Sequence, residues 1–143
     1  MRERTLVLIK PDAVRRHLIG EIIRRIEAKG LDILATKMLR FDEELTRRHY
    51  GQYAALPFYP ALSEFIQSGP SVALVVEGND AIALVRLMMG ATRPADAAPG
   101  TIRGDFANDT TANIIHGSDS PETAQREIAC FFTEGEIFAR MGA

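Results

Sequence analysis

The chain has 143 residues and a formal net charge of -2, with 17 Lys and Arg against 19 Asp and Glu. Hydrophobic residues make up 46% and charged residues 25%, which is the composition of a packed globular protein and not of a disordered chain. The length fits one domain, residues 1–143, and the weak net charge supplies no overall field for nucleic acid or anionic lipid. We therefore expect no nucleic-acid or membrane partner, and any anion site must be local.

The cysteine content and the N-terminal segment both bear on the cellular compartment. The one cysteine, Cys130, excludes an internal disulfide and a CxxC motif. The apolar run at residues 6–9 is shorter than a signal-peptide core or a membrane span. We expect a soluble cytoplasmic protein.

The first third of the chain predicts two strands with a helix between them. Residues 5–9 form a short apolar run that Pro11 ends, as in a strand buried on both faces. Isoleucines recur at helical spacing over residues 19–29, which predicts an amphipathic helix that stops at Gly30. Residues 31–41 alternate loosely between apolar and polar and predict the second strand.

A pair of helices is predicted next. Asp42 can cap a helix that runs to about residue 55 and is ended by Pro57. Pro60 can occupy the first turn of a second, short helix that stops at Gly69. We expect these two helices to form a hairpin.

The next predicted strand and helix lead into a long loop. Residues 71–77 predict a strand, and a helix begins at Asn79 or Asp80 and ends before Gly90. Residues 91–112 contain two prolines, two glycines and many small polar residues. A loop of this length in a compact domain is often functional.

The last elements are a brief strand and a well-capped helix. Residues 113–116 predict the strand, and Ser120 followed by Pro121 is a strong start for a helix that reaches Phe132. Strands thus alternate with helices, which indicates an α/β or α+β layered domain. Periodicity does not choose the order of strands in the sheet.

Phosphate binding, if present, must use side chains and irregular backbone. Neither a GxxxxGK[ST] loop nor a GxGxxG turn occurs in the sequence. Polar residues gather instead beside the ends of elements, at residues 9–12, 101–105 and 113–120.

His116 is the candidate nucleophile in the last of these stretches. Imidazole is largely neutral at cellular pH and has a lone pair for attack. A lone histidine is more often a structural residue, but glycine, two serines and an aspartate crowd the same turn. Ser120 is the helix cap under either interpretation, so Ser118 is the better candidate for assisting chemistry.

Three cations are candidates for binding phosphate. Lys10, Arg86 and Arg103 are each ordinary surface charges when considered singly. Together with His116 they form a possible clamp for a triphosphate.

Five motifs run in order along most of the chain: RTLVLIKPD from Arg4, PFYP from Pro57, SGP from Ser68, GTIRGDF from Gly100 and NIIHGSDS from Asn113. Together they resemble the nucleoside diphosphate kinase family, with matching segments from Arg4 to Phe132. The NxxHGSDS string is far more specific than a short motif.

The resemblance implies a fold and a reaction. The fold is α+β: a ferredoxin-like βαββαβ core, with a four-stranded antiparallel sheet covered by helices and a helix hairpin inserted after the second strand. The reaction is ping-pong, in which a nucleoside triphosphate, mainly ATP, phosphorylates His116 and a second nucleoside diphosphate collects the phosphoryl group.

The resemblance also implies a cofactor and an assembly. Mg²⁺ is expected as cofactor, held mainly by nucleotide phosphates and water and with few protein ligands of its own, so no metal-ligating residue is assigned. A homo-oligomer is expected, more a hexamer than a tetramer, with the loop from Thr92 to Ala112 near the trimer contacts.

Catalytic roles follow for five residues that match the family motifs. His116 attacks the γ-phosphorus, and Glu127 holds the other ring nitrogen. Lys10 serves the transferring phosphate and the sugar 3'-hydroxyl with Tyr50 beside it, and Ser118 assists.

The resemblance assigns the remaining matching residues to substrate binding. Asn113 binds the ribose hydroxyls together with Lys10, and the β- and γ-phosphates are held by Arg86, Thr92 and Arg103. Phe58 stacks on the base in a slot bounded by Leu62 and Thr110, and stacking accepts any base.

An alternative interpretation is a non-catalytic module of the same fold that binds nucleotides, nucleic acid or a protein partner. Single residues have plain structural interpretations too. Phe58 could be a core residue, Tyr50 a packing residue on a helix surface, and Glu127 a solvated helix charge.

Overall fold

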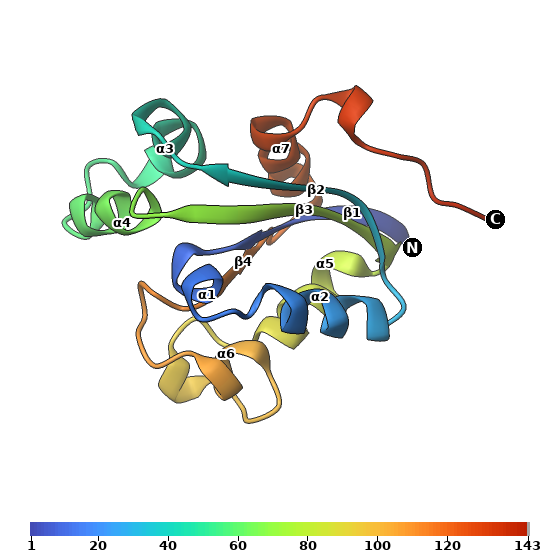
Figure 1. Cartoon of the computed structure of the whole chain (residues 1–143), viewed down its shortest axis with the longest axis horizontal. Helices are drawn as coiled ribbons and strands as arrows, with labels where there is room; N and C mark the ends of the chain where they lie inside the picture. Colours follow the sequence, from blue (N-terminus) through green and yellow to red (C-terminus); the bar gives the residue numbers. More distant parts are fainter. Residues whose placement is uncertain (143) are drawn as a thin grey trace.

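One antiparallel sheet of four strands forms the centre of the molecule, in the order β2-β3-β1-β4 (Figure 1). The computed structural model describes residues 1–142. The strands are β1 (Arg2–Ile9), β2 (Asp32–Arg40), β3 (Pro70–Asn79) and β4 (Ile115–Gly117). β1 pairs antiparallel with β3 on one side and with β4 on the other, where Leu8 lies opposite His116. This order is the ferredoxin-like arrangement that the resemblance implied, so the predicted fold class is confirmed.

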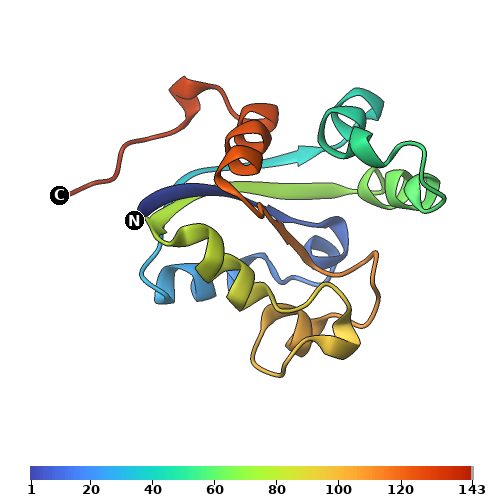
Figure 2. The same ribbon diagram turned by 180° about the vertical axis from the view of Figure 1, so that it is seen from behind.

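Helices cover both faces of the sheet. They are α1 (Pro11–Arg15), α2 (Ile19–Ala28), α3 (Glu43–Tyr50), α4 (Tyr59–Ile66), α5 (Ala81–Met89), α6 (Ile102–Phe106) and α7 (Pro121–Phe131). Figure 1 and Figure 2 show α1, α2, α5 and α6 on one side of the sheet and α3 and α7 on the other. The α3 and α4 pair is the predicted hairpin inserted between β2 and β3. Among residues 1–142, no helix has the length and apolar character needed to cross a membrane.

The alternation of side chains along β1 divides the core into two layers. Val7 and Ile9 pack with α2, α5 and α6, whereas Leu6 and Leu8 pack with α3, α4 and α7. All four side chains are fully buried. Because both faces of β1 are covered, its apolar run is continuous, as the sequence predicted.

Several predicted boundaries were wrong. Pro11 was expected only to end the first strand, but it also begins α1, since proline suits the first turn of a helix. The predicted loop at residues 91–112 contains α6, which Thr101 caps by accepting a hydrogen bond from Gly104 N at 3.0 Å. The helix predicted to reach about residue 55 ends at Tyr50 and continues as the 3-10 turn Gly51–Tyr53.

Strand ends also differ from the prediction, whereas two predicted caps are confirmed. The first strand begins at Arg2, and the last is Ile115–Gly117 in place of residues 113–116. The side chain of Asp42 accepts from Leu45 N at 2.8 Å. Ser120 Oγ accepts from Thr123 N at 3.1 Å and starts α7.

We expect Gly104→Ala to destabilise the protein, because a Cβ at this position in α6 overlaps the backbone carbonyl of Ala98. Overpacking of this kind costs about 1–3 kcal/mol. Gly20→Ala is the matched control: it lies in α2 with no atom within 4 Å of the added Cβ, and alanine favours a helix by about 0.5–1 kcal/mol. Urea unfolding of both variants measures the difference. Equal stability of the two variants contradicts the close approach of α6 to Ala98.

Candidate active site

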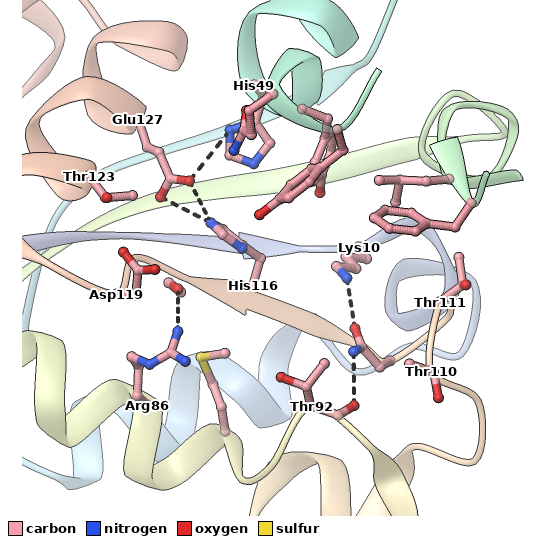
Figure 3. A pocket seen from close by; sticks show the side chains of 18 of the residues that line it. Lys10, His49, Arg86, Thr92, Thr110, Thr111, His116, Asp119, Thr123 and Glu127 are labelled. Atoms are coloured by element: carbon pink, nitrogen blue, oxygen red, sulfur yellow. Dashed lines mark hydrogen bonds and ion pairs between the residues drawn. The ribbon is translucent and has the colours of Figure 1, made fainter. Parts of the chain in front are cut away.

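A pocket of about 610 Å³ opens between the helix hairpin, the end of α5 and the C-terminal helix (Figure 3). Every residue predicted for the site except Ser118 lines it: Lys10, Tyr50, Phe58, Leu62, Arg86, Thr92, Arg103, Thr110, Asn113, His116 and Glu127. Ser118 is fully buried directly behind the pocket and contacts Glu127. Residues far apart in the chain therefore meet at one place.

A strained turn sets the position of Asn113 and His116. Ile114 has φ of +79°, which for a β-branched residue costs on the order of 1–3 kcal/mol. Its backbone N–H donates to Asp12 Oδ2 at 3.1 Å, and its side chain is fully buried. The turn faces Asn113 into the pocket and returns the chain to β4 in time for His116 to pair with Leu8.

Glu127 holds the Nε2 edge of the His116 ring. His116 Nε2 lies 3.0 Å from both carboxylate oxygens of Glu127. Ser118 Oγ donates to Glu127 Oε1 at 2.7 Å, and Leu6 N donates to Ser118 Oγ at 3.3 Å. Burial alone raises the pKa of Glu127, but the hydrogen bonds from His116 and Ser118 outweigh it and bring the pKa below its usual value.

An ionised Glu127 fixes the tautomer of His116. The carboxylate only accepts hydrogen bonds, so Nε2 carries the proton and Nδ1 keeps its lone pair. The side chain of His116 is 26% exposed, whereas that of Glu127 is 4% exposed. The structural alternative of a solvated helix charge for Glu127 is therefore wrong.

Lys10 is a nearly buried cation at the end of β1. Its Nζ donates to Asn113 Oδ1 at 2.7 Å, which joins the first and last of the predicted polar stretches. Burial and, to a smaller extent, the nearby charge of Arg103 lower the pKa of Lys10 to about 8.

Backbone carbonyls hold the two predicted arginines. Arg103 donates to the carbonyls of Ile115 at 2.7 Å, Gly90 at 3.1 Å and Asn113 at 3.3 Å. Burial and, to a smaller extent, the charge of Arg86 lower its pKa to about 10. Arg86 donates to the carbonyl of Gly117 at 3.2 Å. Within residues 1–142, neither arginine nor Lys10 forms an ion pair with a carboxylate, so their charges remain available to an anion.

Aromatic side chains form the outer part of the pocket. Phe58 is 50% exposed at the rim and lies 5.7 Å from the ring of Tyr53. The alternative of a core role for Phe58 is therefore wrong. Tyr50 is buried and lines the pocket, and burial raises the pKa of its hydroxyl. Asn113 Nδ2 donates to the carbonyl of Thr92 at 3.3 Å, which connects the long loop to the site.

Several residues of the pocket were not predicted from the sequence: His49, Gln52, Tyr53, Met89, Thr111, Gly117, Asp119, Thr123 and Arg126. His49 is the most notable of them, because it is buried and its ring lies 5.0 Å from that of His116 in an edge-to-face arrangement. The only available signal was its position next to Tyr50. Asp119 belongs to the predicted polar stretch, but no role was assigned to it.

The pocket combines features of a particular kind of enzyme. Cations without carboxylate partners suit phosphate, an exposed ring suits a base, and a histidine backed by a carboxylate suits nucleophilic attack. Such a site is that of a phosphotransferase acting on nucleotides.

Comparison with known proteins identifies the family. The model of the family described as nucleoside diphosphate kinase matches residues 3–137. The nucleoside diphosphate kinase of Methanosarcina acetivorans is 58% identical over 135 residues, covering 94% of this chain and 91% of that protein. The enzyme of a Thermus thermophilus strain is 57% identical over 135 residues, covering 94% and 98%. This chain belongs to the nucleoside diphosphate kinase family.

A solved structure supports the same family assignment. The halophilic nucleoside diphosphate kinase of Halobacterium salinarum, in complex with CDP, superposes with a TM-score of 0.96 at 49% identity, covering 99% of this chain and 95% of that one. The resemblance seen in the motifs is confirmed, and the findings support an enzyme over a non-catalytic module.

We expect Lys10 to make stability depend on pH in the alkaline range. The unfolded chain keeps this proton up to about pH 10.5, but the folded protein releases it near pH 8. Because the unfolded state binds more protons in this window, the free energy of unfolding rises as the pH increases through it.

Lys10→Met removes the titrating group with little change of shape. Urea unfolding of both proteins across the window isolates the contribution of Lys10. The stability of the wild type relative to the variant should increase with pH, and a constant difference contradicts the lowered pKa.

Proposed function

We propose that this chain transfers the γ-phosphoryl group of a nucleoside triphosphate, mainly ATP, to nucleoside diphosphates through Nδ1 of His116. Nδ1 attacks the γ-phosphorus, the bond from that phosphorus to the β-phosphate oxygen breaks, and the diphosphate leaves. A second diphosphate then attacks the phosphohistidine and restores the free ring. The observation that carries this proposal is the pair of 3.0 Å contacts from Nε2 to Glu127, which leave Nδ1 free.

Glu127 acts as a positioning residue in this mechanism. Its carboxylate orients the imidazole and stabilises the positive charge that develops on the ring as Nδ1 forms a bond to phosphorus. Ser118 fixes Glu127 through its 2.7 Å hydrogen bond. Neither residue needs to exchange a proton with the substrate.

Lys10, Arg86 and Arg103 bind the phosphates, with Thr92 beside them. A transferring phosphoryl group requires preorganised charge rather than covalent chemistry from the protein. The contacts of both arginines with backbone carbonyls support this role, because they fix the guanidinium groups without neutralising them.

The rim of the pocket binds the nucleoside. Phe58 stacks on the base between Leu62 and Thr110, and Asn113 and Lys10 bind the ribose hydroxyls with Tyr50 beside them. Half of the Phe58 side chain is exposed, which supports stacking on a ligand. The Halobacterium salinarum relative was solved in complex with CDP, which supports nucleotide binding by this chain.

Magnesium accompanies the nucleotide in this proposal. The carboxylates that line the pocket are those of Glu127 and Asp119, and Glu127 is engaged by His116 and Ser118. These residues fit a hydrated ion bound chiefly through phosphate oxygens, to which Asp119 would contribute the available protein carboxylate. When bound, Mg²⁺ neutralises charge on the phosphates.

The assembly and cellular location are further parts of the proposal. We infer a homo-oligomer built from one domain, residues 1–143, with a hexamer favoured over a tetramer by resemblance to members with a TIRGDF loop. The single cysteine supports a cytoplasmic location.

Labelling tests the phosphohistidine. Incubation with ATP labelled on the γ-phosphate should give a base-stable, acid-labile label on the wild type and none on His116→Ala. His17→Asn is the matched control, because His17 is exposed and asparagine tolerates its φ of +61°. A label retained by a folded His116→Ala variant contradicts the proposal.

Glu127→Gln should slow labelling without abolishing it. The lost interaction is a hydrogen bond to a charged group, worth roughly 1.5–3 kcal/mol, which corresponds to a rate reduction of about ten- to more than a hundredfold. Rapid-quench kinetics measures this rate. An unchanged rate is inconsistent with a positioning role for Glu127.

A further inference from the structure

The proposed phosphoryl transfer leaves His49 without a function. This side chain is 1% exposed, and within the described residues neither of its ring nitrogens has a hydrogen-bond partner. Buried polar atoms are normally paired, and an exception calls for an explanation. His49 also lines the pocket, so its ring is close to the space in which ligands bind.

The ring of His49 lies beside two other side chains of types that can bind a metal. His49 Nδ1 is 3.8 Å from Glu127 Oε2, too long for a hydrogen bond, and His116 Nε2 is 3.0 Å from the same oxygen. One ligand atom from each of these three residues lies within 4.8 Å of the others. Figure 3 shows the three side chains converging from α3, β4 and α7.

Two histidines and one carboxylate are a donor set typical of zinc. Zinc binds imidazole nitrogen and carboxylate oxygen at about 2.0–2.2 Å, so tetrahedral donors lie roughly 3.4 Å apart. The two distances of 3.0 Å and 3.8 Å to Glu127 Oε2 lie on either side of this value. All three side chains line the pocket, so water can reach them, as in zinc sites with three protein ligands and a bound water.

The protonation states favour coordination. Neither ring nitrogen of the buried His49 has a hydrogen-bond partner within the described residues, so a neutral ring there keeps a lone pair for a ligand. A neutral imidazole and an ionised carboxylate are the forms that bind metal.

We propose that His49, His116 and Glu127 form a binding site for a divalent transition metal of the zinc type. The site is separate from the Mg²⁺ that accompanies the nucleotide, since Mg²⁺ prefers six oxygen ligands and retains water, whereas imidazole suits zinc and copper.

The site has a consequence that rests on the proposed function. A metal on Nε2 of His116 displaces the hydrogen bond to Glu127, and the proton of the neutral ring then resides on Nδ1. Protonated Nδ1 has no lone pair for attack on phosphorus, so the bound metal inhibits phosphorylation of His116 without blocking the rim that binds the base.

Histidine NMR tests the site in the nucleotide-free wild type, with zinc chloride alone as the probe. The chain has three histidines, and His17 is exposed and lies outside the cluster, so it serves as an internal control. One equivalent of Zn²⁺ should shift the ring nitrogens of His49 and His116 together and leave those of His17 unchanged. Equal additions of Mg²⁺ should shift none of them. Zinc shifts confined to His17, or absent, overturn the proposal.

Calorimetry with variants gives an independent measurement. His49→Gln removes one ligand and should weaken zinc binding at least tenfold, whereas His17→Asn should leave it unchanged. If His49→Gln does not fold, Glu127→Gln removes the charged ligand and should have the same effect. Undiminished affinity in a folded variant of either ligand overturns the site.

Inhibition of His116 phosphorylation by the bound metal is tested separately, by γ-phosphate labelling at saturating zinc. Zinc should slow labelling of the wild type. His17→Asn should be slowed to the same extent as the wild type at each zinc concentration, which supports inhibition through the cluster. Because the NMR and calorimetric measurements use no nucleotide, failure of His116 to become phosphorylated leaves their outcome unaffected.

Discussion

The carboxylate of Glu127 is a charge held inside the protein, and such a charge is costly unless polar groups surround it. Its neighbours form a continuous chain of hydrogen bonds, from the backbone N–H of Leu6 through Ser118 and Glu127 to His116. The central strand thereby fixes the orientation of a ring that lies beside it. Removing any member leaves a buried group without its partner, so reactivity and stability depend on the same interactions.

The pairing of strands in the sheet brings the two ends of the site together. β1 and β4 are adjacent, so Lys10 just after β1 and the turn before β4 lie at the same edge of the molecule. Asp12 binds the backbone of Ile114 and keeps that residue in a conformation that it adopts only under constraint. The first and last polar stretches of the sequence therefore form one site although about a hundred residues separate them.

The sequence predicted the succession of strands and longer helices, because apolar periodicity and caps such as Asp42 and Ser120 are local signals. It did not predict α1 or α6, since helices this short depend on tertiary contacts. The antiparallel order came from the family resemblance alone. Pocket residues were identified from motifs, but His49 was missed because its environment is created only when α3 packs near α7.

Arg103 has a second role that follows from its three carbonyl partners. The guanidinium group joins the end of α5, at Gly90, to the segment that leads into β4. Truncating this side chain leaves three backbone acceptors without their donor, so a change at position 103 lowers stability and also removes a charge from the pocket. One side chain thus both lines the pocket and braces the backbone around it, so tolerance to substitution at this position is limited by the backbone that it holds.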